Sequence, residues 1–135
     1  MSPSALALTG FAAWTLFLVL MIGLYRAGLV LTGRRAPNQF DPGGADVGEF
    51  SRRLCRAHAN CYENLPIFGG LIAVALATGQ QHLTDGLALW FLAARIGQSI
   101  VHLVSTSNGA VNVRFALYLS QWLIMALMAV RLLTA

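Results

Sequence analysis

Four long apolar segments constrain what this chain can fold into. They cover residues of about 5–31, 54–77, 83–104 and 111–134. A helix needs roughly 20 mostly apolar residues to cross the hydrocarbon of a bilayer, and each segment is about that long or longer. Only 10% of the 135 residues are charged, whereas a soluble domain usually has about 25%. The sequence therefore predicts one all-α domain over residues 1–135, an integral membrane bundle of four transmembrane helices.

The arginines predict how this bundle lies in the membrane, because all nine basic residues are Arg. Cytoplasmic connections carry an excess of basic residues. Four arginines flank the first connection and one follows the third: Arg34, Arg35, Arg52, Arg53 and Arg114. We expect both connections on the cytoplasmic side and both termini on the opposite side. The net charge of +4 suits contact with anionic lipid, whereas the scattered arginines do not predict a nucleic-acid partner.

The most informative polar cluster lies where the second apolar segment begins. In the stretch RRLCRAHANCYENLPIF, residues 52–68, Arg56, Asn60 and Glu63 stand at i, i+4 and i+7. On a helix these three side chains share one face. Ionisable groups inside a bilayer are costly and usually mark a functional site. A guanidinium, an amide and a carboxylate on one face are typical of a socket for a small zwitterionic ligand.

A second charged residue lies at a matching depth in the third segment. Glu63 and Arg95 are each about nine residues from the cytoplasmic ends of their helices, roughly 13 Å at about 1.5 Å per residue. An unpaired charge at that depth costs at least a few kcal/mol. We therefore predict a buried Glu63–Arg95 ion pair, with a purely structural role for that pair as the alternative.

Further polar residues lie on the expected cytoplasmic half. Gln98 and His102 follow Arg95 at i+3 and i+7, and Arg114 and Tyr118 form an i, i+4 pair where the fourth helix begins. We expect these side chains to converge with those of the second helix in one layer. His58 is offset from the predicted face, so it is either a helix-end residue or part of the rim.

Other kinds of site have little support. The sequence contains no HxxxH or HExxH pattern, so no metal site is predicted. Cys55 and Cys61 point about 120° apart on a helix, so no disulfide is expected between them. No arrangement of Ser, His and Asp, or of Cys and His, indicates a nucleophilic triad or dyad.

The segment RAHANCYENLPIF, residues 56–68, closely resembles the signature R-A-H-x-N-x-x-E-x-x-x-x-F of the MAPEG family. That family of membrane proteins includes microsomal glutathione transferases, prostaglandin E synthase and leukotriene synthase, and has many bacterial members. The Arg of the third segment and the Arg-x-x-x-Tyr of the fourth match as well. The resemblance implies a homotrimer that binds glutathione, as a co-substrate, between subunits near the cytoplasmic side. We expect a location in a bacterial inner membrane.

The resemblance also implies roles for individual residues. Arg114 would be the catalytic residue that stabilises the glutathione thiolate. Glutathione would be bound by residues of the second, third and fourth helices, with a looser match after the first: Arg56, Asn60, Glu63, Gln98, His102, Tyr118, Arg34 and Arg35. Ala59 and Phe115 depart from the Arg and Ser of prostaglandin E synthase. The expected activity is therefore a general glutathione transferase or peroxidase acting on a lipophilic small molecule, rather than prostaglandin synthesis.

Two other functions stay open at this stage. The first is a non-catalytic lipid-binding or scaffold protein on the same fold. The second is a small four-helix multidrug transporter. Those transporters resemble this chain in size but carry an essential carboxylate in the first helix, whereas residues 5–31 contain no acid.

Overall fold

The computed structural model describes all residues from 1 to 135. The chain forms four helices and no strand: α1 (Pro3–Leu31), α2 (Glu49–Ala77), α3 (His82–Val104) and α4 (Asn108–Leu133). Three of them, α1, α3 and α4, are long and apolar enough to cross a membrane. The fourth, α2, does not meet that criterion, because its first half carries several charged and amide side chains. The predicted all-α membrane fold is thus confirmed, with three clearly apolar spans.

Polar caps determine where the helices begin. Ser2 accepts a hydrogen bond from the backbone N–H of Ala5 (3.2 Å) at the start of α1, and Ser107 accepts one from Ala110 (3.2 Å) at the start of α4. Such caps satisfy backbone donors that the first helical turn leaves free. For α2 and α4 the structure places the start upstream of the predicted residues 54 and 111. The first turns of these two helices contain polar residues, so a prediction based on apolar runs places the start of each helix too late.

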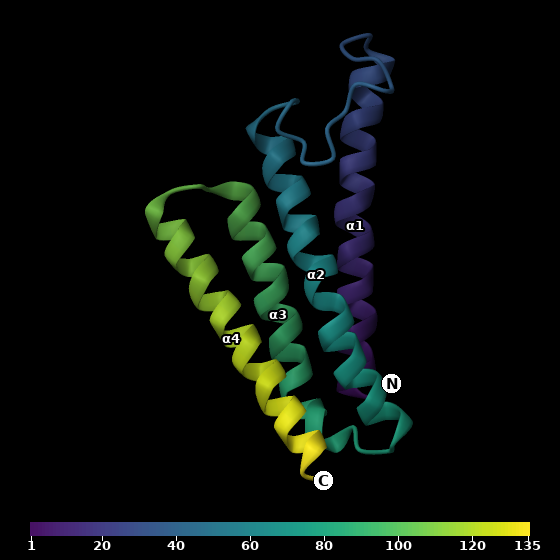
Figure 1. Cartoon of the computed structure of the whole chain (residues 1–135), viewed down its shortest axis with the longest axis vertical. Helices are drawn as coiled ribbons and strands as arrows, with labels where there is room; N and C mark the ends of the chain where they lie inside the picture. Colours follow the sequence, from purple (N-terminus) through teal and green to yellow (C-terminus); the bar gives the residue numbers. More distant parts are fainter.

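The helices pack as a bundle in which α1 and α4 do not touch. The closest pairings are α3 with α4 and α1 with α2, and α3 also packs on α1 and α2. Both chain termini lie at one end of the bundle, and the α1–α2 and α3–α4 connections lie at the other (Figure 1). This is the relative arrangement that the distribution of arginines predicted.

An aromatic cluster joins α1, α2 and α3 in the apolar half. The rings of Phe68 and Phe91 stack with centroids 3.9 Å apart, and the Phe11 ring lies 5.6 Å from that of Phe91. All three side chains are fully buried. Because Phe91 lies one turn before Arg95 on α3, this cluster fixes the three helices directly beside the polar layer.

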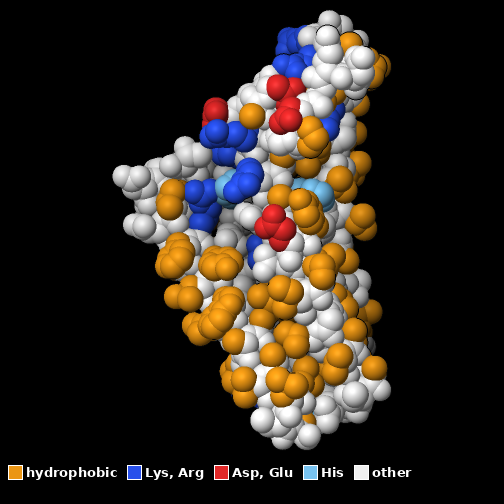
Figure 2. All heavy atoms as spheres, in the orientation of Figure 1, with side chains coloured by type: hydrophobic (Ala, Val, Ile, Leu, Met, Phe, Trp, Pro, Cys, Tyr) orange, Lys and Arg blue, Asp and Glu red, His pale blue; other side chains and the backbone are white.

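The surface divides into a polar and an apolar half. Figure 2 shows arginine side chains gathered in the upper half of the visible face and hydrophobic side chains covering the lower half. Many large apolar side chains on α1 and α4 are exposed, among them Leu16, Phe17, Trp122 and Leu123. Exposed apolar surface of this extent suits contact with lipid rather than with water.

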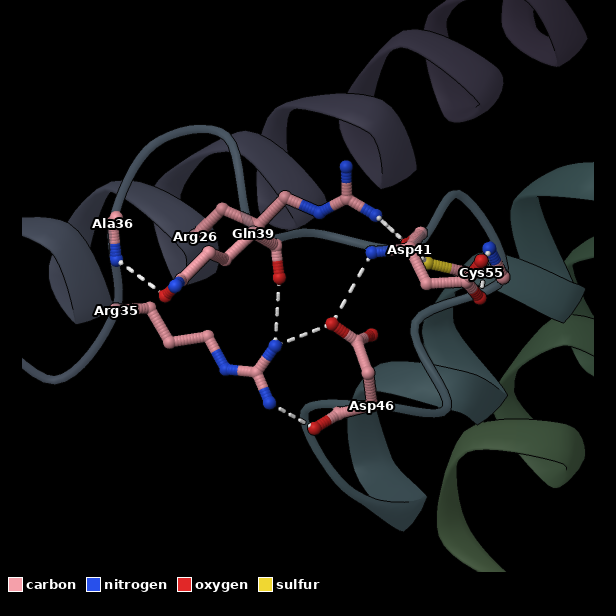
Figure 3. Close-up of polar contacts among 8 residues, drawn as sticks. Arg26, Arg35, Ala36, Gln39, Asp41, Asp46 and Cys55 are labelled. Carbon is pink, nitrogen blue, oxygen red and sulfur yellow. Dashed lines mark hydrogen bonds and ion pairs between the residues drawn. The ribbon is translucent and has the colours of Figure 1, made fainter.

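The α1–α2 connection is tied down by its own polar side chains (Figure 3). Arg35 forms an ion pair with Asp46 and donates to the carbonyl of Gln39 (2.8 Å), while Arg26 of α1 donates to the carbonyl of Asp41 (2.9 Å). Lost hydration raises the pKa of Asp46. The Asp41 N–H and the Arg35 charge outweigh that effect, so the pKa lies below its ordinary value of 3.8. The carboxylate therefore stays ionised and holds the loop closed.

Candidate functional site

Two adjoining cavities between α2, α3 and α4 gather most of the predicted site residues. The first has a volume of about 200 Å³. Its lining residues are Asn60, Gln98, His102, Val111, Arg114, Phe115 and Tyr118. The second has a volume of about 350 Å³ and is lined by Arg52, Arg53, Arg56, His102, Thr106 and Arg114. His102 and Arg114 form the wall that both cavities share. The structure thus brings residues of three helices into one layer, as the sequence predicted.

Arg114 is held at this shared wall by His102. The side chain of Arg114 is half-buried, and its Nη1 contacts Nδ1 of His102. A guanidinium has only donors, so Nδ1 must be the acceptor and the proton of the neutral ring is on Nε2. The buried Nε of Arg114 has no hydrogen-bond partner within the protein. Arg114 therefore keeps a donor that a bound anion could satisfy.

The second cavity has the electrostatics of an anion site. Four guanidinium groups line it, and no carboxylate does. Of these four, Arg52 alone forms an ion pair, with the exposed Glu49 at 3.1 Å. Guanidinium groups bind carboxylates and phosphates through paired hydrogen bonds. A ligand with one or more carboxylates fits this cavity, whereas a cation does not.

Arg95 lies behind the first cavity, in the interior of the bundle. Its side chain is 1% exposed, and its Nη1 donates to Oε1 of Gln98 at 3.0 Å. The guanidinium carbon also lies 5.8 Å from the centroid of the Phe11 ring. Its Nε and Nη2 have no partner. Arg95 is therefore a buried charge that forms no ion pair within the chain.

The predicted Glu63–Arg95 ion pair is wrong for the single chain. The structure contains two ion pairs, Arg35–Asp46 and Arg52–Glu49, and Glu63 is exposed. The residue of α2 that faces α3 is Cys61, whose Sγ lies 3.7 Å from Oγ of Ser99. Glu63 follows two residues later and so points about 200° away around the helix. A similar predicted depth on two helices therefore did not make the two side chains face each other.

The residues predicted to share one face of α2 line cavities on two different sides of that helix. Asn60 lines the first of the cavities beside α4, whereas Glu63 lines a different cavity of about 460 Å³ between α1, α2 and the loop above them. Arg56 borders the cavities on both sides. His58 lines the cavity next to α1 and neither of the two cavities between α2, α3 and α4.

The remaining predicted residues lie elsewhere, and several lining residues were missed. Arg34 and Arg35 line none of these three cavities, and Arg35 is engaged within the loop. Arg52 and Arg53 were used only to predict the orientation of the chain. Their position within one turn before Arg56 was a signal that they share its cavity. Thr106, in the short α3–α4 connection, carried no comparable signal.

One of three comparisons with known proteins identifies a family for this chain. No curated protein and no solved structure matches the chain. The model of the MAPEG family matches residues 4–134, which is nearly the whole length. The polar layer between α2, α3 and α4 contains four of the residues that suggested this family from the sequence: Arg56, Asn60, Arg114 and Tyr118. The chain is an integral membrane protein and belongs to the MAPEG family.

Proposed function

We propose that this protein is a membrane-bound glutathione transferase or peroxidase. The observation that carries the proposal is the half-buried Arg114, held by His102 where an arginine-lined cavity meets a second polar cavity. An anion-binding pocket beside a fixed guanidinium is what binding and activating an acidic thiol require. Membership of the MAPEG family, which includes glutathione transferases, supports this choice.

The two cavities suit the different parts of glutathione. This tripeptide carries two carboxylates, an amino group and a thiol. Arg52, Arg53 and Arg56 would bind the carboxylates in the larger cavity. Asn60 and Tyr118 would contact the peptide groups in the smaller one, which places the thiol near Arg114.

The chemistry would begin with ionisation of the thiol. A free thiol has a pKa of about 8.5 and is mostly protonated at neutral pH. A guanidinium at hydrogen-bond distance favours the thiolate, and each unit by which it lowers the pKa is worth about 1.4 kcal/mol. In the transferase reaction the thiolate forms a sulfur–carbon bond with an electrophile, and the leaving group departs with its electron pair. In the peroxidase reaction the thiolate sulfur attacks a hydroperoxide oxygen and the O–O bond breaks, which forms glutathione sulfenic acid. The alkoxide that leaves takes up the proton released by the thiol and departs as an alcohol. A second glutathione then converts the sulfenic acid to a disulfide and water.

A lipophilic second substrate would reach the thiol from the bilayer. Val111 and Phe115 of α4 line the smaller cavity, and both side chains are exposed. They provide an apolar edge beside Arg114 that faces outward from the bundle. A substrate dissolved in lipid can approach along this edge without first crossing water.

The polar surface of α2 supports the assembly that the family resemblance implies. Glu63 is exposed on a helix whose second half is apolar. A carboxylate that faced acyl chains would cost a few kcal/mol. We propose a homotrimer in which a neighbouring protomer covers Glu63, which then accepts a hydrogen bond from the amino group of the glutathione bound by that neighbour. In this proposal the α1–α2 and α3–α4 connections face the cytoplasm and the membrane is a bacterial inner membrane.

The proposal is tested with purified protein in detergent. Conjugation of glutathione to a reactive aromatic halide and reduction of a lipophilic hydroperoxide are measured for the wild type, Arg114→Ala and Arg131→Ala. Arg131 is a matched control, because it lies on the same helix and donates only to the carbonyl of Leu83 (3.2 Å) at the other end. We expect Arg114→Ala to lower kcat by about 10²–10³, the usual effect of losing a donor to a developing anion.

Binding is measured in parallel through the thermal stabilisation that glutathione produces. Arg114→Ala should keep most of this stabilisation, since the other arginines still hold the carboxylates. Full activity in Arg114→Ala, or an equal loss of binding and turnover, rejects the catalytic role. A wild type that binds glutathione without turning over either substrate would identify a non-catalytic member. A wild type that neither binds nor reacts refutes the proposal.

A further inference from the structure

A buried hydrogen-bond network connects the interior of the bundle to the backbone of Arg114. It consists of Arg95 and Gln98 on α3 and Gln121 on α4, and none of these side chains is more than 8% exposed. We infer that Gln98 is a positioning residue that holds Arg114 in place, supported from behind by Arg95 and Gln121. This inference rests on the proposed function, because it takes Arg114 as the catalytic residue.

The chemistry of the neighbours fixes the orientation of the Gln98 amide. Oε1 of Gln98 accepts from Nη1 of Arg95 (3.0 Å) and from Nε2 of Gln121 (3.1 Å). A guanidinium can only donate, so the side of the amide that faces Arg95 must be the oxygen. The Nε2 group therefore faces the opposite way, where it donates to the backbone carbonyl of Arg114 at 3.2 Å. Reversing the amide would lose all three hydrogen bonds.

Arg114 is consequently held by α3 at two points. Gln98 holds its backbone, and His102, one turn further along the same face of α3, holds its guanidinium. With only one of these contacts, the side chain could swing or the first turns of α4 could shift away from α3. With both, the position of the guanidinium is determined by α3, which is itself packed against α1 and α2.

Gln121 and Arg95 keep Gln98 from turning. Nε2 of Gln121 also donates to the carbonyl of Leu117 (2.8 Å), so Gln121 is tied to its own helix, two turns after Arg114. Both supporting side chains are 1% exposed. Water cannot replace their hydrogen bonds at this burial, so a lost contact leaves an unsatisfied polar group. The network thus holds the Gln98 amide in one orientation, with its donor directed at the backbone of Arg114.

This arrangement predicts which step a change at Gln98 affects. Carboxylates of the ligand are bound by arginines that Gln98 does not touch, so the KM for glutathione should change little. Misplacement of a catalytic group by about 1 Å lowers the rate strongly. We expect Gln98→Met to reduce kcat by between about tenfold and a hundredfold and to raise the pKa of the bound thiol toward that of free glutathione.

The experiment compares Gln98→Met with Ser99→Ala, a matched control on the neighbouring buried position. Ser99 also takes part in several hydrogen bonds, accepting from Nε1 of Trp14 (3.2 Å) and donating to the carbonyl of Arg95 (3.0 Å), but it forms no hydrogen bond with α4. Two readouts are collected for each protein. Hydrogen exchange over residues 108–118 reports whether the start of α4 has loosened, and the ultraviolet absorbance of the thiolate gives the pKa of bound glutathione.

Gln98→Met should speed exchange over residues 108–118 and raise the pKa of the bound thiol, whereas Ser99→Ala should do neither. A third variant, Gln98→Glu, keeps oxygen acceptors for Arg95 and Gln121 but removes the donor to Arg114. It should behave like Gln98→Met, and a Gln98→Glu variant with wild-type kcat would overturn the inference.

The outcomes also separate this inference from the proposed function. Unchanged exchange over residues 108–118 in Gln98→Met refutes the positioning role, whatever the activity of the protein. Faster exchange with an unchanged thiol pKa and kcat, in an active protein, refutes it as well. If the wild type itself forms no glutathione thiolate, the proposed function fails, and with it the positioning of Arg114 for thiol activation.

Discussion

Replacing Arg95 by Met should leave the stability of the bundle almost unchanged and yet lower its activity. Arg95 is the largest fully buried side chain, and a buried arginine between helices is commonly read as structural glue. The structure argues otherwise, because Arg95 forms no ion pair within the chain and two of its three guanidinium nitrogens have no partner. Met has a similar reach and needs no hydrogen bond, so it can fill the same space.

The expected magnitude follows from the contacts. Burying the guanidinium costs about 2.5–3.5 kcal/mol on the scale for insertion at the centre of a membrane helix. Its hydrogen bond to Gln98 stabilises the folded protein by about 1.5–3 kcal/mol, and its position over the Phe11 ring stabilises it by about 0.5–2 kcal/mol. The two sides cancel to within about 2 kcal/mol. Breaking a buried ion pair would instead destabilise the protein by about 3–5 kcal/mol.

The assay is reversible unfolding in mixed micelles with increasing SDS, followed by the helical circular dichroism signal. Phe91→Ala serves as the control, one turn away on the same helix, because it opens a cavity in the aromatic cluster and should cost roughly 3 kcal/mol. We expect the free energy of unfolding of Arg95→Met to lie within about 2 kcal/mol of the wild type. Its kcat should fall, since Gln98 loses the donor that orients its amide.

A loss of 3 kcal/mol or more in Arg95→Met, comparable to that of Phe91→Ala, would contradict this reasoning. It would mean that Arg95 is paired with an acid in the assembled protein, through a contact that a single chain does not form. Unchanged kcat together with unchanged stability would contradict the other half of the argument, namely that Arg95 acts on the site through Gln98.

Two further predictions concern the α1–α2 connection. Because the folded pKa of Asp46 is lowered, its ion pair with Arg35 should stabilise the loop above the ordinary pKa of 3.8 and lose that effect as the pH falls through the folded value. The difference in Tm between the wild type and Asp46→Asn should therefore be present at neutral pH and vanish in strong acid; a difference that persists there would argue against the ion pair. Gly44→Ala should lower Tm, because Gly44 has φ +71 and an added Cβ would lie 2.7 Å from Oγ of Ser51 and 2.8 Å from Sγ of Cys55. The same change at Gly33, which also has a positive φ but open space around it, should cost less.

Much of the architecture was predictable because hydrophobic length and spacing along one helix are properties of the sequence itself. Long apolar runs predicted four helices, and the structure has four at nearly the predicted positions. The spacing of Arg114 and Tyr118 placed them on one face of α4, and both line the same cavity. The arginine distribution predicted that the α1–α2 and α3–α4 connections share one end of the bundle, as they do in Figure 1.

What the sequence could not determine was the rotation of each helix about its own axis. Depth in the bundle follows from a fixed rise per residue, so the sequence could predict similar levels for Glu63 and Arg95. Which side of α2 faces α3 depends on packing between helices, and the structure shows that Cys61 occupies that position. Glu63 consequently points away from α3, and Arg95 forms its hydrogen bond with Gln98 instead.

The same limit applies to the network behind Arg114. Gln121 stands two turns after Arg114, a spacing that reveals a shared face but not a partner on another helix. Only the packing of α4 on α3 brings its amide within 3.1 Å of Gln98. The residues of this site and their order along each helix could therefore be predicted from the sequence. Their pairing was decided by how the helices are rotated toward one another, because contacts between helices depend on side chains far apart in the chain.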